Sequence, residues 1–404
     1  MESLTSAILL MTPGCYMASV DLQDAYYSVP INEKCQKYLK FSWQGELFQF
    51  TCLPNGLASA PRLFTKLLKP VYSTLRQMGH TNVGYIDDSY LQGLSFEDCS
   101  NNVQDTVHLF TKVGFLLNQE KSVLVPRHEL TFLGFILNSL TMTVRPTPEK
   151  AAKLKQKCLA VLTNTHVSVH DISEVIGLMV CMFPGVEYAQ LFYRSLEIDK
   201  IKALKESRGN YNSVMILSDT SVIDLKWWIK NVESSFKWIS HGDPLFSLYS
   251  DASKEGWGAV CKGDKTGGRW TVTESNPHIN ELETLAAFFA LKSFWPSMTN
   301  CHINIYIDNT TAVSYINAMR GTHSLECNKI EIWTWCIQRN IWVTAISLPG
   351  KENVDADRES RTFNDNTEWS LKENIFHSIV ETYGMPSIDL FASRINRKVP
   401  RYAS

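Results

Sequence analysis

VGYIDDSYLQG, residues 83–93, places two adjacent aspartates between two apolar arms. Apolar runs on both sides of a polar pair predict two short strands, with Asp87 and Asp88 at a hairpin tip or a strand end. Asp-Asp is also a common turn dipeptide, so the pair alone does not define a site. Adjacent carboxylates are costly unless cations neutralise them, and Mg²⁺ prefers oxygen ligands. Two such ions about 3.5–4 Å apart can stabilise the attacking and leaving oxygens of phosphoryl transfer.

A third carboxylate comes earlier in the chain. Residues 16–20 (YMASV) are apolar and are followed by Asp21, which predicts a buried strand with the carboxylate at its end. Asp21 could instead cap a helix. Together with Asp87 and Asp88 it would complete an acidic site for two metal ions.

The segment between these carboxylates carries a hairpin signature and a helix signature. Residues 38–43 and 47–52 are rich in β-forming residues and flank the turn residues 44–46 (QGE), so a hairpin is predicted. A helix is expected to open at Ser59 and Pro61. The apolar stripe predicted for this helix consists of Leu63, Leu67, Val71 and Leu75, with Phe64 and Leu68 beside it.

The order of these segments resembles that of the reverse transcriptases. The matching segments are motif A at 21–26 (DLQDAY), motif B at 53–61 (LPNGLASAP), motif C at 85–88 (YIDD), motif D at 114–115 with Lys121, and motif E at 130–135 (LTFLGF). The resemblance implies a palm with a ferredoxin-like core, in which Asp21 and Asp87 hold the metal ions and Asp88 supports them.

The same resemblance implies contacts to the incoming nucleotide. Tyr26 is expected to act as a gate that stacks under the deoxyribose and excludes a 2′-hydroxyl. Asn55, next to Gly56, would lie against the nucleotide, and Lys121 would help to protonate the pyrophosphate. Plainer roles exist for each: a half-buried aromatic for Tyr26, a turn residue for Asn55 and a solvated charge for Lys121.

Residues 146–238 show a helical pattern and no catalytic constellation. The stretches 149–162 and 172–182 are amphipathic and strongly apolar, respectively, and Trp227-Trp228 lies in another amphipathic stretch. Their position after motif E implies the thumb and connection of a reverse transcriptase. Lysines between residues 150 and 157 could touch phosphates of a duplex, although a solvated helix face is the simpler explanation for each.

A second set of carboxylates follows strand signals in the last third of the chain. The β-rich run 245–249 ends near Asp251, and 256–260 and 269–272 predict two further strands. The apolar run 303–307 predicts another strand that ends at Asp308.

A helical signal of this region places a third acidic group, and a turn near the end of the region places two more. A helix is predicted with an apolar stripe of Leu282, Leu285, Ala286 and Phe289, and Glu283 falls at the edge of this stripe. The remaining expected elements are helices at 310–319 and 324–338, a strand at 341–347, and a turn followed by residues 355–357 with their two aspartates.

This second half resembles ribonuclease H. The matching stretches are 250–258 (SDASKEGWG), 279–286 (INELETLA), 307–312 (IDNTTA) and 356–361 (ADRESR). The resemblance implies that two Mg²⁺ (or Mn²⁺) ions are held by four carboxylates and that water attacks the RNA strand of an RNA–DNA hybrid. The four expected ligands are Asp251, Glu283, Asp308 and Asp357.

The register of the resemblance favours Glu283 over Glu281 and Asp357 over Asp355. The sequence departs from the family at one position. Just before the Pro-Gly pair, here Pro349-Gly350, the family usually has a histidine that is thought to help proton transfer or product release. Ser347 stands there. The substitution bears on turnover and leaves metal binding intact.

The resemblance is closest to the DIRS-type retrotransposons, and a pararetroviral polymerase is a weaker match. It rests on MASVDLQDAYYSVPI at 17–31, HINELE at 278–283, YIDNTTAVSYINAMRGTHS at 306–324, PGKENVDADRESR at 349–361 and the tail 383–393. The expected substrates and partners are an RNA template, a DNA primer, an RNA–DNA hybrid and deoxynucleoside triphosphates. A decayed fragment that only binds nucleic acid, or that retains hybrid cleavage alone, is the other hypothesis.

We therefore expect an α/β (α+β) chain with a reverse transcriptase palm, a helical thumb and connection, and a ribonuclease H-like mixed-sheet domain. The expected bounds are 1–143, 144–240 and 241–362, with a C-terminal extension at 363–404. Asp21 lies near the start of the chain, so the fingers are expected to be largely absent and polymerase activity to be weak.

Composition is compatible with this organisation. The 404 residues are 44% hydrophobic and carry a net charge of −2, so any nucleic-acid groove is local. Ten cysteines without a CxxC pair indicate free thiols in a reducing, intracellular setting, in the cytoplasm or the nucleus. No apolar run is long enough to span a membrane, so no membrane partner is expected.

Overall fold

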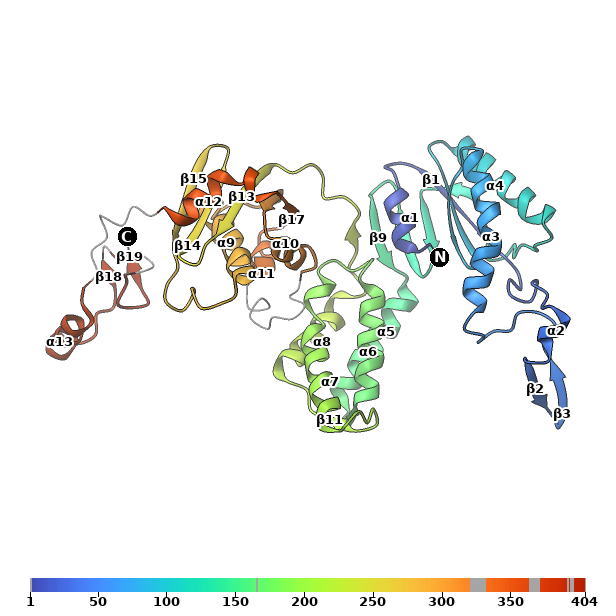
Figure 1. Ribbon diagram of the computed structural model, residues 1–404, viewed down its shortest axis with the longest axis horizontal. Helices are drawn as coiled ribbons and strands as arrows, with labels where there is room; N and C mark the ends of the chain where they lie inside the picture. The colour runs from blue at the N-terminus through green and yellow to red at the C-terminus, as the bar shows by residue number, and fades with distance from the viewer. Residues whose placement is uncertain are drawn as a thin grey trace. The chain divides into compact units, whose positions relative to one another are not determined.

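The computed structural model describes residues 2–164, 166–319, 332–362, 371–390, 392 and 396–403. Contacts divide the chain into two compact units, Met1–Ser240 and His241–Ser404, which Figure 1 shows along the colour bar from blue to red. The boundary expected after residue 240 falls between these units. The finer boundaries expected at 143 and 362 stay predictions. Within the described residues, no helix is long and apolar enough to cross a membrane.

The first unit is built on a βαββαβ arrangement. Its four-stranded sheet has the order β4-β5-β1-β6, and all neighbouring pairs are antiparallel. Helices α3 and α4 join the strands, so the expected ferredoxin-like core is confirmed. The bounds are β1 (Tyr16–Asp21), α3 (Ala60–Gln77), β4 (Thr81–Tyr85), β5 (Asp88–Gly93), α4 (Phe96–Lys112) and β6 (Val123–Arg127).

The two faces of this sheet are both covered. Ala18 and Val20 of β1 pack with α3 and α4, whereas Met17 packs on the opposite face with α1 (Leu4–Leu10) and a second sheet. This alternation is the two-residue period of a strand. The second sheet has the order β12-β9-β8-β7, with β7 (Glu129–Phe132), β8 (Phe135–Asn138), β9 (Thr143–Pro146) and β12 (Lys237–Trp238).

The apolar stripe expected on α3 is only partly buried. Leu63 and Leu67 are each 48% exposed, while Phe64, Leu68 and Leu75 are buried. At about 100° per residue, a four-residue spacing advances some 40° around the helix at each step. The repeat that begins at Leu63 therefore starts on the solvent side and reaches the core only near its end.

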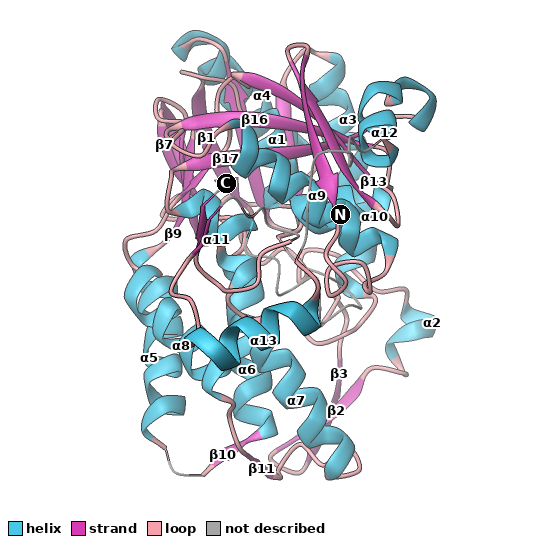
Figure 2. Cartoon of the chain, turned by 90° about the vertical axis from the view of Figure 1, so that its left-hand side faces the viewer, coloured by secondary structure: helices cyan, strands magenta, loops and turns pink. Residues whose placement is uncertain are grey.

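The remaining segments of this unit are a hairpin and a helical bundle. The expected hairpin forms around Gln44 and Gly45, both at positive φ, as a two-residue hairpin turn requires. Four helices enclose their own core around Trp228 and Met179, and Figure 2 shows them in cyan. The bounds are α2 (Glu33–Gln36), β2 (Lys40–Trp43), β3 (Glu46–Gln49), α5 (Pro148–Thr163), β10 (Val167–Ser168), α6 (Val169–Met182), η1 (Ala189–Leu191), α7 (Arg194–Glu206), β11 (Val214–Met215) and α8 (Asp219–Asn231).

The second unit is a five-stranded mixed sheet of order β15-β14-β13-β16-β17. The first three strands are antiparallel, and β16 and β17 run parallel to β13, which confirms the expected mixed sheet. The bounds are β13 (Phe246–Ala252), β14 (Gly256–Cys261), β15 (Asp264–Arg269), α9 (Ile279–Phe294), β16 (Cys301–Ile307), α10 (Thr310–Asn317), α11 (Ile332–Ile337), β17 (Ile341–Ser347), η3 (Gly350–Glu352) and α12 (Val354–Arg361). The segment after α12 contains α13 (Glu373–Tyr383), β18 (Asp389–Leu390) and β19 (Tyr402–Ala403).

Two expectations for this unit need correction. The strand expected at 269–272 lies earlier, at Asp264–Arg269, because Lys262 and Gly263 form a tight turn at positive φ. That strand is polar and glycine-rich, so it lacks the usual apolar signal. The helix expected at 324–338 is described only as Ile332–Ile337, and its residues 324–331 lie outside the described part.

Candidate active sites

The aspartates of the first unit meet where two strands end. Asp88 begins β5 and pairs across the sheet with Asp21, the last residue of β1. The backbone N–H of Leu22 donates to the carbonyl of Asp87 at 3.0 Å, which ties the two segments together. Ile86 lies in the turn directly before the two aspartates at φ +53°, a strained conformation for a β-branched residue.

Their electrostatics are those of crowded acids. Burial raises the pKa of Asp88 to about 7, and the charges of Asp87 and Asp21 add to the rise. Burial also raises the pKa of Asp87, while the ammonium of Lys121 opposes that rise. Such a set favours a neutralising cation, and carboxylate oxygens are the donors that Mg²⁺ prefers.

An open cavity of about 660 Å³ lies beside two of these carboxylates, and Asp21, Asp87 and Lys121 line it. The turn that carries Lys121 is fixed by Asn118, whose backbone N–H donates to the carbonyl of Asp21 at 2.9 Å. Lys121, which was expected to protonate the pyrophosphate, therefore lines the same cavity as the expected metal ligands Asp21 and Asp87.

The other expected substrate residues are placed differently. Tyr26 packs edge-on against Phe64 at 5.5 Å between ring centroids, and burial and then the charge of Asp87 raise its pKa. Tyr26 thus lies near the acidic site. Asn55 is exposed and donates to the hydroxyl of Tyr27 at 3.0 Å, next to Gly56 at φ +83°. Neither Asn55 nor Gly56 is among the described residues that line the cavity beside Asp21 and Asp87.

The second unit gathers three of its four expected ligands. Carboxylate oxygens of Asp251, Glu283 and Asp308 lie within 4.8 Å of one another. Tyr249 of β13 pairs with Tyr306 of the parallel strand β16. Asp251 and Asp308 each lie two residues further along the chain, so they lie side by side at the same end of the sheet. Glu283 comes from α9, which packs across β13.

Asp251 and Glu283 are both buried, at 3% and 4% exposed, although Glu283 was expected only at the edge of the apolar stripe. Burial raises the pKa of Glu283 to about 9, with Asp251 and Asp308 adding to the rise. The pKa values of Asp251 and Asp308 are raised as well, in both cases chiefly by burial.

One oxygen of Glu283, Oε2, is buried without a hydrogen-bond partner. A buried, unpaired carboxylate oxygen beside two other carboxylates costs free energy unless a cation occupies the space they share. The donor set is all oxygen, which suits Mg²⁺ or Mn²⁺. The residues present therefore fit the expected divalent cation.

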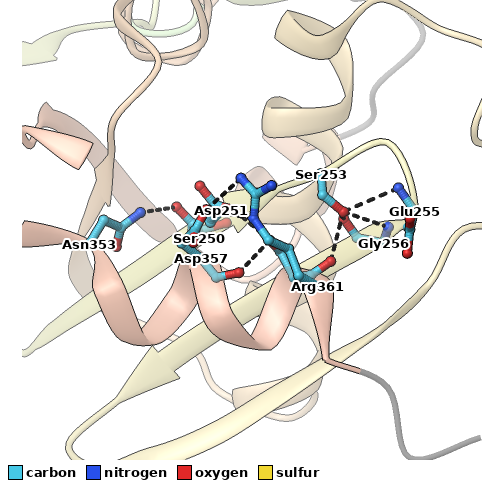
Figure 3. Close-up of polar contacts among 9 residues, drawn as sticks. Ser250, Asp251, Ser253, Glu255, Gly256, Asn353, Asp357 and Arg361 are labelled. Atoms are coloured by element: carbon cyan, nitrogen blue, oxygen red, sulfur yellow. Dashed lines mark hydrogen bonds and ion pairs between the residues drawn. The ribbon is translucent and has the colours of Figure 1, made fainter. Parts of the chain in front are cut away.

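Asp357 approaches the same site from α12. Figure 3 shows it with Arg361 beside Asp251, and the Nε and Nη2 atoms of Arg361 donate to Asp357 Oδ1 at 2.9 and 2.7 Å. The charge of Asp357 raises the pKa of Asp308 and of Asp251, so the carboxylate is close enough to act on both. Its alternative, Asp355, is exposed and pairs with Lys265 at 2.9 Å instead.

The position of the missing histidine lies at the same end of the sheet. Ser347 pairs with Ile307, directly before Asp308. A Cβ added to Gly350 would meet Asp308 Oδ2 at 3.0 Å, so the 347–350 loop runs against this carboxylate.

Several residues of this site were missed by sequence reasoning. Ser360 donates to Asp251 Oδ2 at 2.6 Å, and Asn353 donates to the carbonyl of Ser250 at 3.0 Å. Both come from the segment around α12. The helical spacing of Asp357, Ser360 and Arg361 was the available signal, because residues three and four apart share one helix face.

Residues 3–137 match the family model described as reverse transcriptase (RNA-dependent DNA polymerase). Residues 243–339 match the model described as the RNase H-like domain found in reverse transcriptase. The chain carries a reverse transcriptase domain followed by an RNase H-like domain. The second match includes Asp251, Glu283 and Asp308 and ends before Asp357.

Relatives of this domain pair are viral polyproteins. The enzymatic polyprotein of Figwort mosaic virus (strain DxS) is 20% identical over 90% of this chain and 53% of its own length. That of Cauliflower mosaic virus (strain D/H) is 22% identical over 86% and 50%. The Gag-Pro-Pol polyprotein of Human T-cell leukemia virus 2 is 29% identical over 33% and 10%. The chain thus spans about half the length of the two enzymatic polyproteins.

A solved structure shows a similar fold. The foamy viral protease-reverse transcriptase dRH, described in complex with ds DNA, matches with a TM-score of 0.50 and 17% identity, over 86% of this chain and 60% of that one. This likeness confirms the expected fold class of a palm followed by further α/β structure.

Proposed function

We propose that this chain is the polymerase and ribonuclease region of a retroelement of the DIRS type. It would copy an RNA template from a DNA primer and cleave the RNA strand of the resulting hybrid. The observation that carries the proposal is the trio Asp251, Glu283 and Asp308, whose oxygens lie within 4.8 Å of one another. The DIRS assignment rests on the sequence stretches at 17–31, 278–283, 306–324 and 349–361.

In the ribonuclease site, the trio and Asp357 would hold the divalent cations. Two bound cations supply an activated water and stabilise the leaving oxygen of the cleaved phosphodiester. Glu283 is held inside the sheet–helix interface, so its carboxylate has little freedom to reorient. An RNA 2′-hydroxyl at this site would distinguish the RNA strand from DNA.

In the polymerase site, Asp21, Asp87 and Asp88 would hold the cations. The cavity lined by Asp21 and Asp87 would receive the deoxynucleoside triphosphate, and Lys121, which also lines it, would protonate the pyrophosphate. Tyr26 would lie under the sugar, and Asn55 with Gly56 would contact the nucleotide.

The experiment is cleavage of a labelled RNA strand in an RNA–DNA hybrid, with Mg²⁺, by the purified chain. Asp308→Asn removes one metal-binding charge at similar volume and should abolish cleavage. Asp264→Asn, an exposed aspartate of β15, is the matched control and should cut like the parent. Equal cleavage by Asp308→Asn and the parent would reject the assigned site, and a parent that binds hybrid without cutting it would favour a nucleic-acid-binding fragment.

A further inference from the structure

Helix α12 lies in direct backbone contact with the sheet that carries Asp251. A Cβ added to Gly258 of β14 would come within 2.4 Å of Ser360 N and 2.5 Å of Ala356 O. A Cβ at Gly267 of β15 would approach Glu359 O at 3.1 Å. Only glycine permits an approach this close, so the backbone of α12 lies directly against the sheet.

Buried hydrogen bonds fix the helix in the remaining directions. Asn353 Nδ2 donates to the carbonyl of Ser250 at 3.0 Å, and Ser253 Oγ donates to the carbonyl of Ser360 at 2.7 Å. Both acceptors are backbone atoms beside Asp251 or within α12. Translation of α12 along the sheet would break these bonds inside the protein, where an unpaired polar group is costly.

Ser360 of α12 forms a hydrogen bond to the carboxylate of Asp251. Its side chain is fully buried, and its hydroxyl donates to Asp251 Oδ2 at 2.6 Å. The carbonyl of Asp357 lies within 2.8 Å of the same hydroxyl. A hydroxyl has one proton, and the charged, nearer acceptor forms the stronger bond.

We propose that Ser360 is a positioning residue for the ribonuclease site, a role that rests on the function proposed above. The bond to Ser360 engages Asp251 Oδ2 and fixes the plane of the carboxylate. The carboxylate then keeps its orientation toward the space shared with Glu283 and Asp308, whose oxygens lie within 4.8 Å of an oxygen of Asp251. Asp251 is thereby set before a cation arrives, and binding requires little reordering of this ligand.

The test measures binding of Mn²⁺ alone to the full chain, in an Asp87→Asn background that weakens the polymerase site. Ser360→Ala should lower the affinity of the second unit for Mn²⁺ by about 10–100-fold, the usual effect of removing a partner that orients a metal ligand. Hybrid cleavage should fall at low Mn²⁺ and recover in part as the Mn²⁺ concentration rises.

The matched control is Ser221→Ala. Ser221 is also fully buried, and its hydroxyl also donates to an aspartate, Asp199, at 2.6 Å, but in the helical bundle of the first unit. It should leave Mn²⁺ affinity unchanged. A merely structural role for Ser360 would make the two variants behave alike.

Ser360→Cys is a second variant of nearly the same size with a weaker donor, and it carries the comparison if the alanine variant does not fold. It should bind Mn²⁺ more weakly than the parent with unchanged circular dichroism. Parental Mn²⁺ affinity in a folded Ser360 variant would overturn the inference while leaving the proposed function intact. A parent that neither binds Mn²⁺ nor cleaves hybrid would overturn both.

Discussion

Glu283→Gln should stabilise the chain without metal and reduce its stabilisation by metal. Glu283 is 4% exposed and its pKa is raised to about 9 by burial and by its acidic neighbours. The unfolded chain ionises this group at its ordinary pKa of 4.5. The folded chain therefore holds a proton that the unfolded chain has released, and stability falls as pH rises from about 4.5 towards 9.

The size of the effect follows from that window. Between the unfolded-state pKa of 4.5 and pH 7 lie about 2.5 pH units, so burial of Glu283 lowers the free energy of unfolding at pH 7 by at most about 3 kcal/mol. We expect Glu283→Gln to recover about 1–3 kcal/mol, since glutamine keeps the shape and stays neutral. For a unit of this size, each kcal/mol shifts the melting temperature by about 2–4 °C.

In Mg²⁺ the parent gains more stability than the Glu283→Gln variant. A cation at 100 times its Kd adds about 2.7 kcal/mol to the folded parent, whereas the glutamine variant has lost one ligand and gains less. The assay is thermal unfolding of the full chain at pH 7, in EDTA and in Mg²⁺. Glu281→Gln, buried at 8% exposure on the same helix, is the control and should keep the Mg²⁺ response. A Glu283→Gln variant that melts below the parent in EDTA, or responds equally to Mg²⁺, would refute the reasoning.

Three further changes test other parts of the account. Ser347→His should raise multiple-turnover hybrid cleavage by part of the about 10²–10⁴-fold typical of acid–base help, because Ser347 pairs beside Asp308; no change would mean that this loop does not act on the site. Gly258→Ala should reduce cleavage by about 100-fold or more, since its Cβ would meet α12 backbone at 2.4 Å; parental activity would show that α12 tolerates displacement. Asp224→Asn should stabilise the helical bundle by about 1–3 kcal/mol at pH 7 and not at pH 3.5. Burial raises the pKa of Asp224 to about 6, so the stability of the parent falls as pH rises through about 4–6. Denaturant unfolding of parent and variant at the two pH values measures the difference in stability.

The carboxylates could be placed from sequence because their positions follow from local rules. Asp21 and Asp308 each end a short apolar run, and such a run predicts a strand regardless of its partners. Asp87 and Asp88 lie between two such runs. The order of the segments, more than any single residue, identified the two domain types.

The features that could not be predicted from the sequence depend on contacts between segments far apart in the chain. The bond from Ser360 to Asp251 spans 109 positions and exists only because Gly258 lets α12 approach the sheet. Strand β15 is an edge strand whose residues are exposed or half exposed, so its polar, glycine-rich sequence carries no apolar strand signal. Leu63 and Leu67 belong to the predicted apolar stripe of α3 but lie half exposed, because the sequence shows the hydrophobic repeat but not which way it faces.

The claim that most needs a direct measurement is that both acidic clusters are divalent-cation sites. Binding of Mn²⁺ to the full chain, followed by electron paramagnetic resonance of free Mn²⁺, counts these sites without requiring turnover. Asp87→Asn and Asp308→Asn should each remove part of the Mn²⁺ binding of the parent, and the double variant should lose both parts, since the two residues lie in separate units. Mn²⁺ binding that is the same in the parent and the double variant would contradict the account.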